Sequence, residues 1–383
     1  MTIDEKIKLI TRNCEEIITL EDLRELLEDG TQLTHYIGFE ISGLVHLGTG
    51  YISMGKIADF LKAGVKCQIF LADFHTYLNN KLGGNLDDIR WAAGAYFKQA
   101  LIGSLKCHQV DVEARLASGD LTFIHGFDLY KDNLVHWETF MEVGKHVTLS
   151  RNMRSISIMG KKQGNDVSMA TLFYPPLQVA DIYTMRVTLA HAGMDQRKAH
   201  VVARQVAHNL EINPLLNSKG QKIAPVAIHH NLIAGLTGPE KVDTTQAADE
   251  VAIDLKMSKS KPSSAIFVHD SPDEIKDKIR KAYGPPKDIA FNPLLNWVKI
   301  LVFWGDDSGN FVIKRPDKFG GNLNYTSYTK LENDYAEGTL FPLDLKNALA
   351  DWLIKVLEPA RKHFEVAENL QALAKMKSLL TQQ

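Results

Sequence analysis

The sequence predicts an α/β protein, with a parallel-sheet domain over residues 1–269 and a mainly α-helical domain over residues 270–383. Two observations lead to this division. Short apolar runs of strand length alternate with helical patterns in the first two thirds of the chain, which is the rhythm of β-α-β units. A polar, turn-rich stretch at residues 237–255 then precedes a part of the chain where helical periodicity prevails.

The elements of the first domain follow from these patterns in order. The first 30 residues are expected to be helical, because isoleucine and leucine recur near the helical period until Asp29-Gly30. Apolar runs predict strands at residues 34–40, 66–72, 121–125 and 225–229. Helices are predicted at residues 87–105, 131–149, 175–189 and 196–209. Strands and helices in alternation favour a parallel sheet.

In the second domain, helix signals dominate. Ser271, followed by Pro272 and by Glu274 at the third helical position, forms a predicted capping box that begins a helix. An apolar stripe predicts a second, longer helix over residues 344–364.

Composition narrows the functional classes. With 45% hydrophobic and 23% charged residues in 383, the chain is expected to be globular. Lys and Arg total 44 against 46 for Asp and Glu, which weakens, without excluding, a nucleic-acid partner. Cys14, Cys67 and Cys107 match neither a disulfide framework nor a metal motif, so a cytoplasmic location is expected. No apolar run approaches the ~20 residues of a membrane span.

A glycine-rich turn, GLVHLGTG at residues 43–50, lies between the strand at 34–40 and a helix expected from about Leu47. Glycines let a backbone approach a ligand closely, and a helix N-terminus favours phosphate. His46 within the turn is a candidate donor to a phosphoryl oxygen. The alternative is an ordinary turn that carries a surface histidine, since such short patterns recur by chance.

A basic segment, KMSKSK at residues 256–261, follows far downstream. Its ammonium and hydroxyl groups are suited to a triphosphate and a leaving pyrophosphate, although a solvated loop is the alternative. The two motifs, in this order, resemble the HIGH and KMSKS signatures of class I aminoacyl-tRNA synthetases, with Thr49 in place of the second histidine. The resemblance implies catalytic roles for His46, Thr49, Lys256 and Lys259. It implies ATP contacts for Gly38, Glu40, His46, Gly48, Lys256, Met257, Ser258 and Lys259.

A third motif, LFYPPLQVAD at residues 172–181, predicts a helix that begins at its prolines and places Tyr174, Gln178 and Asp181 on one face. A solvated polar face is the alternative. Together with THYIGFE at residues 34–40 and GMDQRKAH at residues 193–200, the motif resembles archaeal and eukaryotic tyrosyl-tRNA synthetases. In that family the residues matching Tyr36 and Asp181 hold the phenol of the substrate tyrosine.

The same resemblance assigns the rest of the site. It implies that Tyr174, Gln178 and Gln196 hold the α-ammonium group, and that His75 in LADFHTYLN lines the pocket. The tRNA contacts that it implies are Arg154, Arg197 and Lys198 at the acceptor stem, and Phe319, Phe341 and Asp344 at the anticodon. From the residues alone, Phe319 is equally a core aromatic.

The family implies a Rossmann-like domain with an insertion at about residues 131–165 and a helical anticodon-binding domain. It implies activation of L-tyrosine by ATP with Mg²⁺, then transfer to tRNA(Tyr), in a homodimer without a protein-bound metal. The insertion is expected to supply the dimer patch through Val135, Trp137, Phe140 and Val143. The alternatives are a tryptophanyl-tRNA synthetase, a small-molecule nucleotidyltransferase with an HxGH turn, and a catalytically silent RNA-binding relative.

Overall fold

The computed structural model describes residues 1–160, 167–238, 257, 262–305 and 309–382. Its larger part is an α/β unit around a six-stranded sheet in the order β1-β6-β5-β2-β3-β4. All neighbouring pairs are parallel except β1 with β6. The strands are β1 (Cys14–Ile18), β2 (Thr34–Phe39), β3 (Lys66–Leu71), β4 (Leu121–His125), β5 (Leu189–Gly193) and β6 (Val226–His230). The predicted fold class is therefore confirmed.

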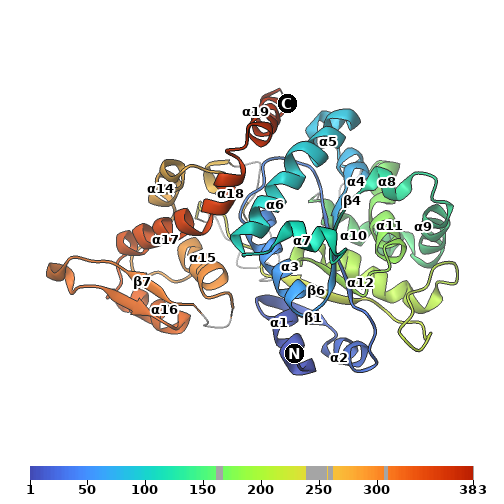
Figure 1. Cartoon of the computed structure of the whole chain (residues 1–383), viewed down its shortest axis with the longest axis horizontal. Coiled ribbons are helices and arrows are strands. Elements are labelled where there is room, and N and C mark those ends of the chain that lie inside the picture. Colours follow the sequence, from blue (N-terminus) through green and yellow to red (C-terminus); the bar gives the residue numbers. More distant parts are fainter. Residues whose placement is uncertain (161–166, 239–256, 258–261, 306–308, 383) are drawn as a thin grey trace.

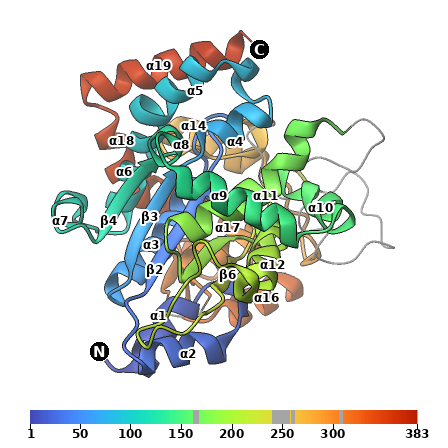
Figure 2. The same cartoon turned by 90° about the vertical axis from the view of Figure 1, so that its right-hand side faces the viewer.

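Helices cover both faces of this sheet (Figures 1 and 2). They are α1 (Ile3–Thr11), α2 (Leu20–Glu28), α3 (Ser53–Lys62), α4 (Asp73–Leu78), α5 (Leu86–Ala92), α6 (Lys98–Cys107), α7 (Val112–Ala117), α8 (Gly126–Tyr130), α9 (Leu134–His146), α10 (Leu149–Ser155), α11 (Met169–Thr184) and α12 (Arg197–Val206). A π-helical turn, η1 (Gly48–Ile52), precedes α3, and another, η3 (Ala93–Phe97), joins α5 to α6.

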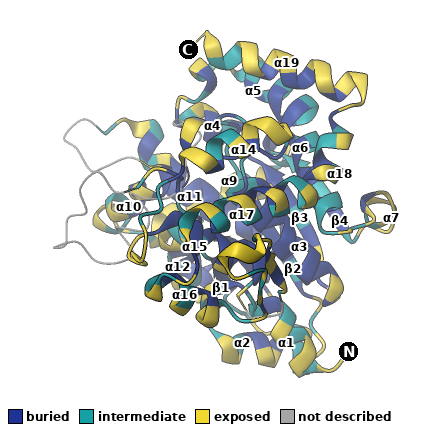
Figure 3. Ribbon diagram, turned by 90° about the vertical axis from the view of Figure 1, so that its left-hand side faces the viewer, coloured by how far each residue is buried: buried dark blue, intermediate teal, exposed yellow. Residues whose placement is uncertain are grey.

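Alternate residues of each strand enter different cores, as the pleat of a sheet requires. Ile37 and Ile69 point into one core with α1, α3 and α6. Tyr36 and Phe70 point into the other, with α11 and α12. Dark blue in Figure 3 shows that burial follows the sheet and the helices against it. Helical propensity alone would leave these short helices marginal, so packing on the sheet stabilises them.

The rest of the chain is mainly helical and lies beside the α/β unit (Figure 1). Its elements are α14 (Pro272–Lys281), α15 (Pro293–Trp297), η8 (Val298–Val302), β7 (Phe311–Ile313), η9 (Asp317–Phe319), β8 (Leu323–Tyr325), α16 (Tyr328–Glu337), α17 (Pro342–Val356), α18 (Glu358–His363) and α19 (Ala367–Thr381). Both hydrogen bonds of the capping box at Ser271 and Glu274 are present, which confirms that prediction. The expected helix over 344–364 is divided, because Pro359 lacks the N–H that would continue α17 into α18.

Strand β1 lies where helix was expected, so that prediction was wrong, and β5 lies between two expected helices, where no element was predicted. Residues 14–18 form β1 because Asn13, at φ 54°, ends α1 and lets the chain pair with β6. Residues 185–189 leave the helical path after α11, and β5 follows with the sequence LAHAG. Every residue of β5 is buried, yet alanine, histidine and glycine lack the β-branched signature of a strand. The short hairpin β7–β8 was likewise not predicted.

The prolines of the third motif do not begin a helix. Helix α11 begins six residues earlier, at Met169, with Ser168 as its N-cap, so Pro175 and Pro176 lie inside it. Pro176 has no N–H to donate to the carbonyl of Leu172, and the side chain of Asn152 donates to that carbonyl instead, at 2.8 Å. This replacement bond makes an internal proline tolerable.

Only some of the side chains expected in the dimer patch lie at the surface of the chain. Val135 and Trp137 on α9 are exposed, and Phe140 is half-buried. Val143 is fully buried inside the chain, so its assignment to a surface patch was wrong; α9 turns this position toward the sheet. Leu134 and Met141 on the same helix are each 69% exposed. Among the described residues, no helix is long and apolar enough to cross a membrane.

Candidate active site

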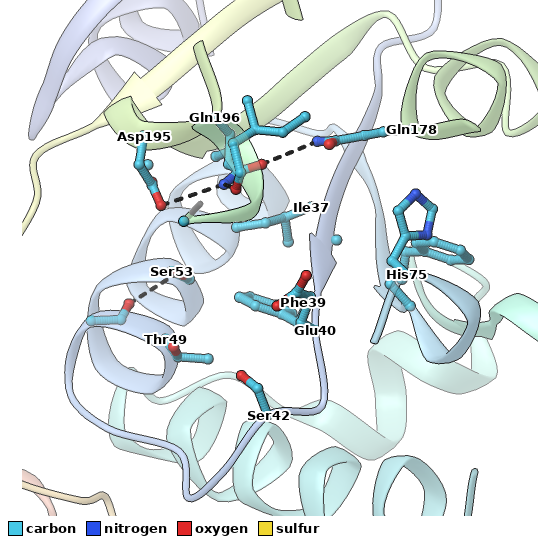
Figure 4. Close-up of a pocket in the computed structure, with 18 of the residues that line it drawn as sticks. Ile37, Phe39, Glu40, Ser42, Thr49, Ser53, His75, Gln178, Asp195 and Gln196 are labelled. Atoms are coloured by element: carbon cyan, nitrogen blue, oxygen red, sulfur yellow. Dashed lines mark hydrogen bonds between the residues drawn. The ribbon is translucent and has the colours of Figure 1, made fainter. Parts of the chain in front are cut away.

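A cavity of about 510 Å³ lies at the carboxyl ends of β2, β5 and β6. Strand order reverses between β2 and β5, and in open α/β sheets ligands bind in the crevice at such a point. Twelve of the residues expected from the sequence to contact substrate line this one cavity: Tyr36, Gly38, Glu40, His46, Gly48, Thr49, His75, Tyr174, Gln178, Asp181, Gln196 and Met257. Figure 4 shows Gln178 and Gln196 at one end and Ser42 and Thr49 at the other.

The glycine-rich turn forms the second end of the cavity. The backbone N–H of Gly48 donates to Nδ1 of His46 at 3.1 Å, so the proton of a neutral ring resides on Nε2. Nε2 lies 3.4 Å from Oγ1 of Thr49. A Cβ at position 48 would lie 3.0 Å from the His46 ring, so a larger residue there would displace the ring. The turn thus orients one imidazole N–H and one hydroxyl at the point where a phosphate group is expected.

Tyr36 and Asp181 lie together in the floor of the cavity. The Asp181 side chain is fully buried, and burial raises the pKa of its carboxyl group. Burial is the main effect that raises the pKa of the Tyr36 hydroxyl, and the charge of Asp181 raises it further. Tyr36 therefore keeps its proton and remains a hydrogen-bond donor. A Cβ at Gly38 would lie 3.0 Å from the hydroxyl of Tyr36, so a larger residue there would press on that hydroxyl.

The wall around Asp181 contains histidine side chains. His75 Nε2 lies 3.5 Å from Asp181 Oδ2, and burial lowers the pKa of His75 to about 3, so its ring is neutral. His136 Nε2 lies 4.0 Å from Asp181 Oδ1, and burial lowers its pKa to about 4. The region therefore holds one carboxyl group among neutral rings.

Sequence reasoning missed Tyr130 and His136 in this region. The hydroxyl of Tyr130, the last residue of α8, donates to Oδ1 of Asp181 at 3.0 Å. Neither residue belongs to one of the recognised motifs, and their spacing carries no signal of a site. Only tertiary packing brings them to Asp181, with α9 packed against α11 and α8 packed against α4 and α9.

Amide and carboxylate groups form the polar rim of the same end. Tyr174 and Asn79 both donate to Oε1 of Glu40 at 2.8 Å. Gln178 Nε2 donates to Gln196 Oε1 at 3.5 Å (Figure 4), and Gln196 Nε2 donates to the carbonyl of Ile158 at 2.9 Å. This set of oxygen acceptors is suited to an ammonium group.

The basic segment is represented by Met257 alone, which is buried and whose N–H donates to the carbonyl of Ile233. Lys256, Ser258 and Lys259 lie outside the described residues. Among the described residues, no cluster of three or more histidine, cysteine, aspartate or glutamate side chains is arranged to hold a metal ion.

The residues expected to contact tRNA lie away from this cavity. Arg154 and Lys198 are exposed and donate to Ser150 and Ser157, respectively. Arg197 forms a bidentate ion pair with Glu16, with N–O distances of 2.8 Å.

The second tRNA group lies in the helical part of the chain. Phe319 and Phe341 are 62% and 58% exposed, which excludes the core reading of Phe319. Arg315 donates to the carbonyls of Gly321 and Thr339, so the turn that carries Phe319 is held near the chain that leads to Phe341. Asp344 is half-buried in the first turn of α17.

Comparisons with known proteins agree with this geometry. Residues 28–358 match the family model described as tRNA synthetases class I (W and Y). A tyrosine–tRNA ligase of Pyrococcus furiosus is 48% identical, and the alignment covers 95% of this chain and 96% of that protein. A crystal structure of tyrosyl-tRNA synthetase complexed with L-tyrosine, from Pyrococcus horikoshii, superposes with a TM-score of 0.93 at 46% identity, covering 99% and 100% of the chains.

A more distant structure shares the fold alone. Tryptophanyl-tRNA synthetase from Aeropyrum pernix superposes with a TM-score of 0.63 at 16% identity, and the match covers 93% of this chain and 84% of that one.

Proposed function

Because the chain belongs to the class I tyrosyl-tRNA synthetases of archaeal type, we propose that it joins L-tyrosine to tRNA(Tyr) at the expense of ATP. The observation that carries this proposal is the single cavity between Asp181 and His46. One end is built for a phenol and an ammonium group, and the other for phosphate. A tyrosine bound at the first end presents its carboxylate toward the second.

At the amino-acid end, we assign the phenol to Tyr36 and Asp181. The neutral Tyr36 donates a hydrogen bond to the phenolic oxygen, and the carboxyl group of Asp181 accepts a hydrogen bond from the phenolic O–H. The ammonium group is assigned to Tyr174, Gln178 and Gln196, which all line the cavity. His75 packs its ring edge-on to Tyr174, with centroids 4.6 Å apart, and shapes the wall between the two groups.

At the nucleotide end, ATP is the substrate and carries Mg²⁺ with it. We assign its contacts to Gly38, Glu40, Gly48, Met257 and Ser258. The tyrosine carboxylate attacks the α-phosphorus, the bond to the β-phosphate oxygen breaks, and pyrophosphate leaves. A ribose hydroxyl of the terminal adenosine of tRNA then takes the tyrosyl group, and AMP leaves.

No protein nucleophile is needed for either step. Catalysis consists of positioning and of stabilising charge that develops on phosphoryl oxygens. We assign that stabilisation to the Nε2–H of His46, the hydroxyl of Thr49, and the ammonium groups of Lys256 and Lys259.

Transfer of the tyrosyl group requires the enzyme to contact tRNA at its acceptor stem and at its anticodon. We assign the acceptor stem to Arg154, Arg197 and Lys198. The exposed rings of Phe319 and Phe341, with Asp344, are assigned to the anticodon, because aromatic faces stack on splayed bases and carboxylates accept from base edges. This division gives an anticodon-binding unit over residues 270–383 and a catalytic unit over residues 1–269 with its insertion at about 131–165.

We further propose a homodimer in the cytoplasm. The exposed apolar side chains of α9, which are Leu134, Val135, Trp137 and Met141, make a face on the insertion that a second copy would cover. The three cysteines are unpaired, as a reducing compartment would leave them.

Charging of tRNA with a mixture of amino acids tests the proposal. The enzyme is incubated with ATP, Mg²⁺, tRNA from an archaeon and all twenty amino acids, and the esterified amino acid is identified by mass spectrometry. Tyrosine on tRNA is expected. Tryptophan on tRNA would indicate a tryptophanyl-tRNA synthetase. Nucleotidyl transfer to another small molecule without charged tRNA would indicate a nucleotidyltransferase, and no product at all would indicate a silent relative.

A further inference from the structure

We propose that Tyr130 is a positioning residue that directs the substrate phenol to one oxygen of Asp181 and thereby sets selectivity for tyrosine over phenylalanine. This inference rests on the proposed function and deepens it. The starting observation is that the two carboxylate oxygens of Asp181 have different surroundings.

One carboxylate oxygen of Asp181 accepts a hydrogen bond and the other does not. Oδ1 accepts the hydroxyl of Tyr130 at 3.0 Å. Within the described part of the chain, Oδ2 has no hydrogen-bond partner although it is buried, and neither has Nε2 of the adjacent His75. Unpaired buried polar atoms are costly, and these two atoms, 3.5 Å apart, belong to residues that both line the cavity, so they indicate where a polar ligand forms hydrogen bonds.

Tyr130 is held rigidly in this role. Its ring packs against His136, Phe74 and Phe70, with centroid separations of 4.5, 5.3 and 6.3 Å. Its carbonyl accepts the indole N–H of Trp137 at 3.2 Å. Packing on several sides fixes the ring, so a phenylalanine at this position would keep the shape of the site and lose only the hydroxyl.

The consequence is geometric. A carboxyl group without Tyr130 would offer two equivalent acceptor oxygens, and either could take the phenol or rotate toward water. With Oδ1 taken by Tyr130, Oδ2 is the carboxylate oxygen left for a ligand in the cavity that Asp181 and Tyr36 both line. A phenol placed there finds one acceptor and one donor, whereas phenylalanine leaves both unpaired, and such unpaired groups are what reject a substrate that lacks the hydroxyl.

The bond also favours the charged form of Asp181. The hydrogen bond from Tyr130 lowers the pKa of Asp181, against the larger effect of burial, which raises it. The other titratable groups around the carboxyl are His75 and Asp73 on α4, His136 on α9, Tyr36 on β2, and Tyr174 on α11 itself. Of these, the charge of Asp73 raises the Asp181 pKa further.

The test is Tyr130→Phe, assayed by tyrosine-dependent pyrophosphate–ATP exchange. The KM for tyrosine should rise about 10- to 100-fold, as expected for loss of a hydrogen bond to a charged group, with a much smaller change in kcat. The KM for phenylalanine should change little, because phenylalanine makes no bond to Asp181. The acid limb of kcat/KM for tyrosine should move to higher pH.

Tyr183→Phe is the matched control. Tyr183 is also buried on the same side of the sheet, and its hydroxyl donates to the carbonyl of Ala203 instead of to Asp181. The control variant should have lower thermal stability, but the ratio of kcat/KM for tyrosine to kcat/KM for phenylalanine should not change. Where Tyr130→Phe is not recovered folded, Tyr130→Met fills the same space without a donor and takes its place.

The outcomes separate the two claims. Wild-type enzyme with no tyrosine-dependent exchange would overturn the proposed function itself. Normal wild-type exchange, with Tyr130→Phe behaving like Tyr183→Phe or losing tyrosine and phenylalanine activity in parallel, would overturn only the role of Tyr130.

Discussion

Phe319 is an aromatic side chain that the fold leaves 62% exposed, in a turn that follows β7. Exposure of this extent means that Phe319→Ala should leave the melting temperature nearly unchanged. Stacking of a base on an aromatic ring is worth roughly 1–3 kcal/mol, so the variant should lose about tenfold or more in tRNA charging efficiency. Pyrophosphate exchange, which does not involve the anticodon, should be unaffected.

The control for this prediction is Val312→Ala, which truncates a nearby apolar side chain that is 46% exposed. Charging and exchange should both remain at wild-type levels. If Phe319→Ala instead melts early and loses both activities together, Phe319 has a structural role and leaves the tRNA site.

Lys259 is proposed to meet the charge of pyrophosphate as it separates from the α-phosphate. Lys259→Ala should therefore slow adenylate formation while the Kd for tyrosine stays the same, with a cost of about 2–4 kcal/mol in the transition state. Single-turnover kinetics measures the two quantities separately. A raised Kd at an unchanged adenylation rate would contradict this role.

At this scale the sequence predicted the residues that belong to motifs. His46, Gln178 and Asp181 were expected to share a site, and the cavity contains all three. Tyr130 was not predicted, because it reaches Asp181 across 51 positions of the chain by the packing of one helix on another. Such a contact has no period and no local signature in a single sequence.

Helix α11 carries Tyr174, Gln178 and Asp181, which we propose bind the amino acid, and its internal prolines make it depend on Asn152 of α10. Asn152→Ala removes the donor to the Leu172 carbonyl and leaves that group unpaired next to Pro176. The free energy of unfolding should fall by about 1–3 kcal/mol. The KM for tyrosine should also rise, because Tyr174 and Gln178 follow Leu172 on the same helix. Chemical denaturation and exchange kinetics measure the two effects.

Asn347→Ala, at an exposed position of α17, is the control and should change neither quantity. An Asn152→Ala variant as stable as the wild type would show that water or another group satisfies the Leu172 carbonyl.

The predicted elements divide by the kind of signal that they carry. Strand β4 was predicted with its observed bounds, since an apolar run between turns is a local feature. Strand β5 was missed because its small residues are selected by close packing in the sheet centre, which the sequence does not display. The start of α11 was misplaced because prolines usually stand in the first turn of a helix, and this rule considers only the local sequence. The side-chain amide of Asn152, which makes the internal proline tolerable, comes from another helix.

At the scale of the whole molecule, a group of histidines is buried in the sheet and in the helix α12 that packs against it. His35 Nε2, His191 and His230 Nδ1 form a chain with N–N distances of 3.0 and 2.8 Å across β2, β5 and β6. His200 and His229 form a second pair at 3.0 Å. Burial lowers the pKa of His35 to about 3 and of His230 to about 4, and holds those of His191 and His200 well below the usual value.

Stability should therefore fall in mild acid. The unfolded chain binds protons on these histidines near pH 6.5, whereas in the folded protein His35 and His230 bind them only at about pH 3–4, and His191 and His200 only well below the usual value. The unfolded state is therefore stabilised relative to the folded state as pH falls below 6.5. Each such histidine contributes about 1.4 kcal/mol per pH unit. The raised pKa of Asp181 acts in the opposite direction, but the histidines are more numerous.

Denaturant titrations at pH 7.5 and pH 5.5 measure this effect, and the free energy of unfolding should be lower at pH 5.5 by several kcal/mol. The variant His146→Ala, at an exposed histidine of α9, should show the same dependence as the wild type. Equal free energies at the two pH values would mean that the histidine chain is charged or opens to water.

Pyrophosphate–ATP exchange with tyrosine, phenylalanine and tryptophan tests the central claim most directly, because Tyr36 and Asp181 are assigned to the phenolic hydroxyl. Tyrosyl-tRNA synthetases are the reference case for rejection of phenylalanine, with a factor of about 10⁵ in kcat/KM. This factor is the value known for the family and is not calculated from the geometry of the cavity. We expect tyrosine to support exchange with a preference of that order. Exchange with phenylalanine or tryptophan as strong as with tyrosine would contradict the assignment of the cavity.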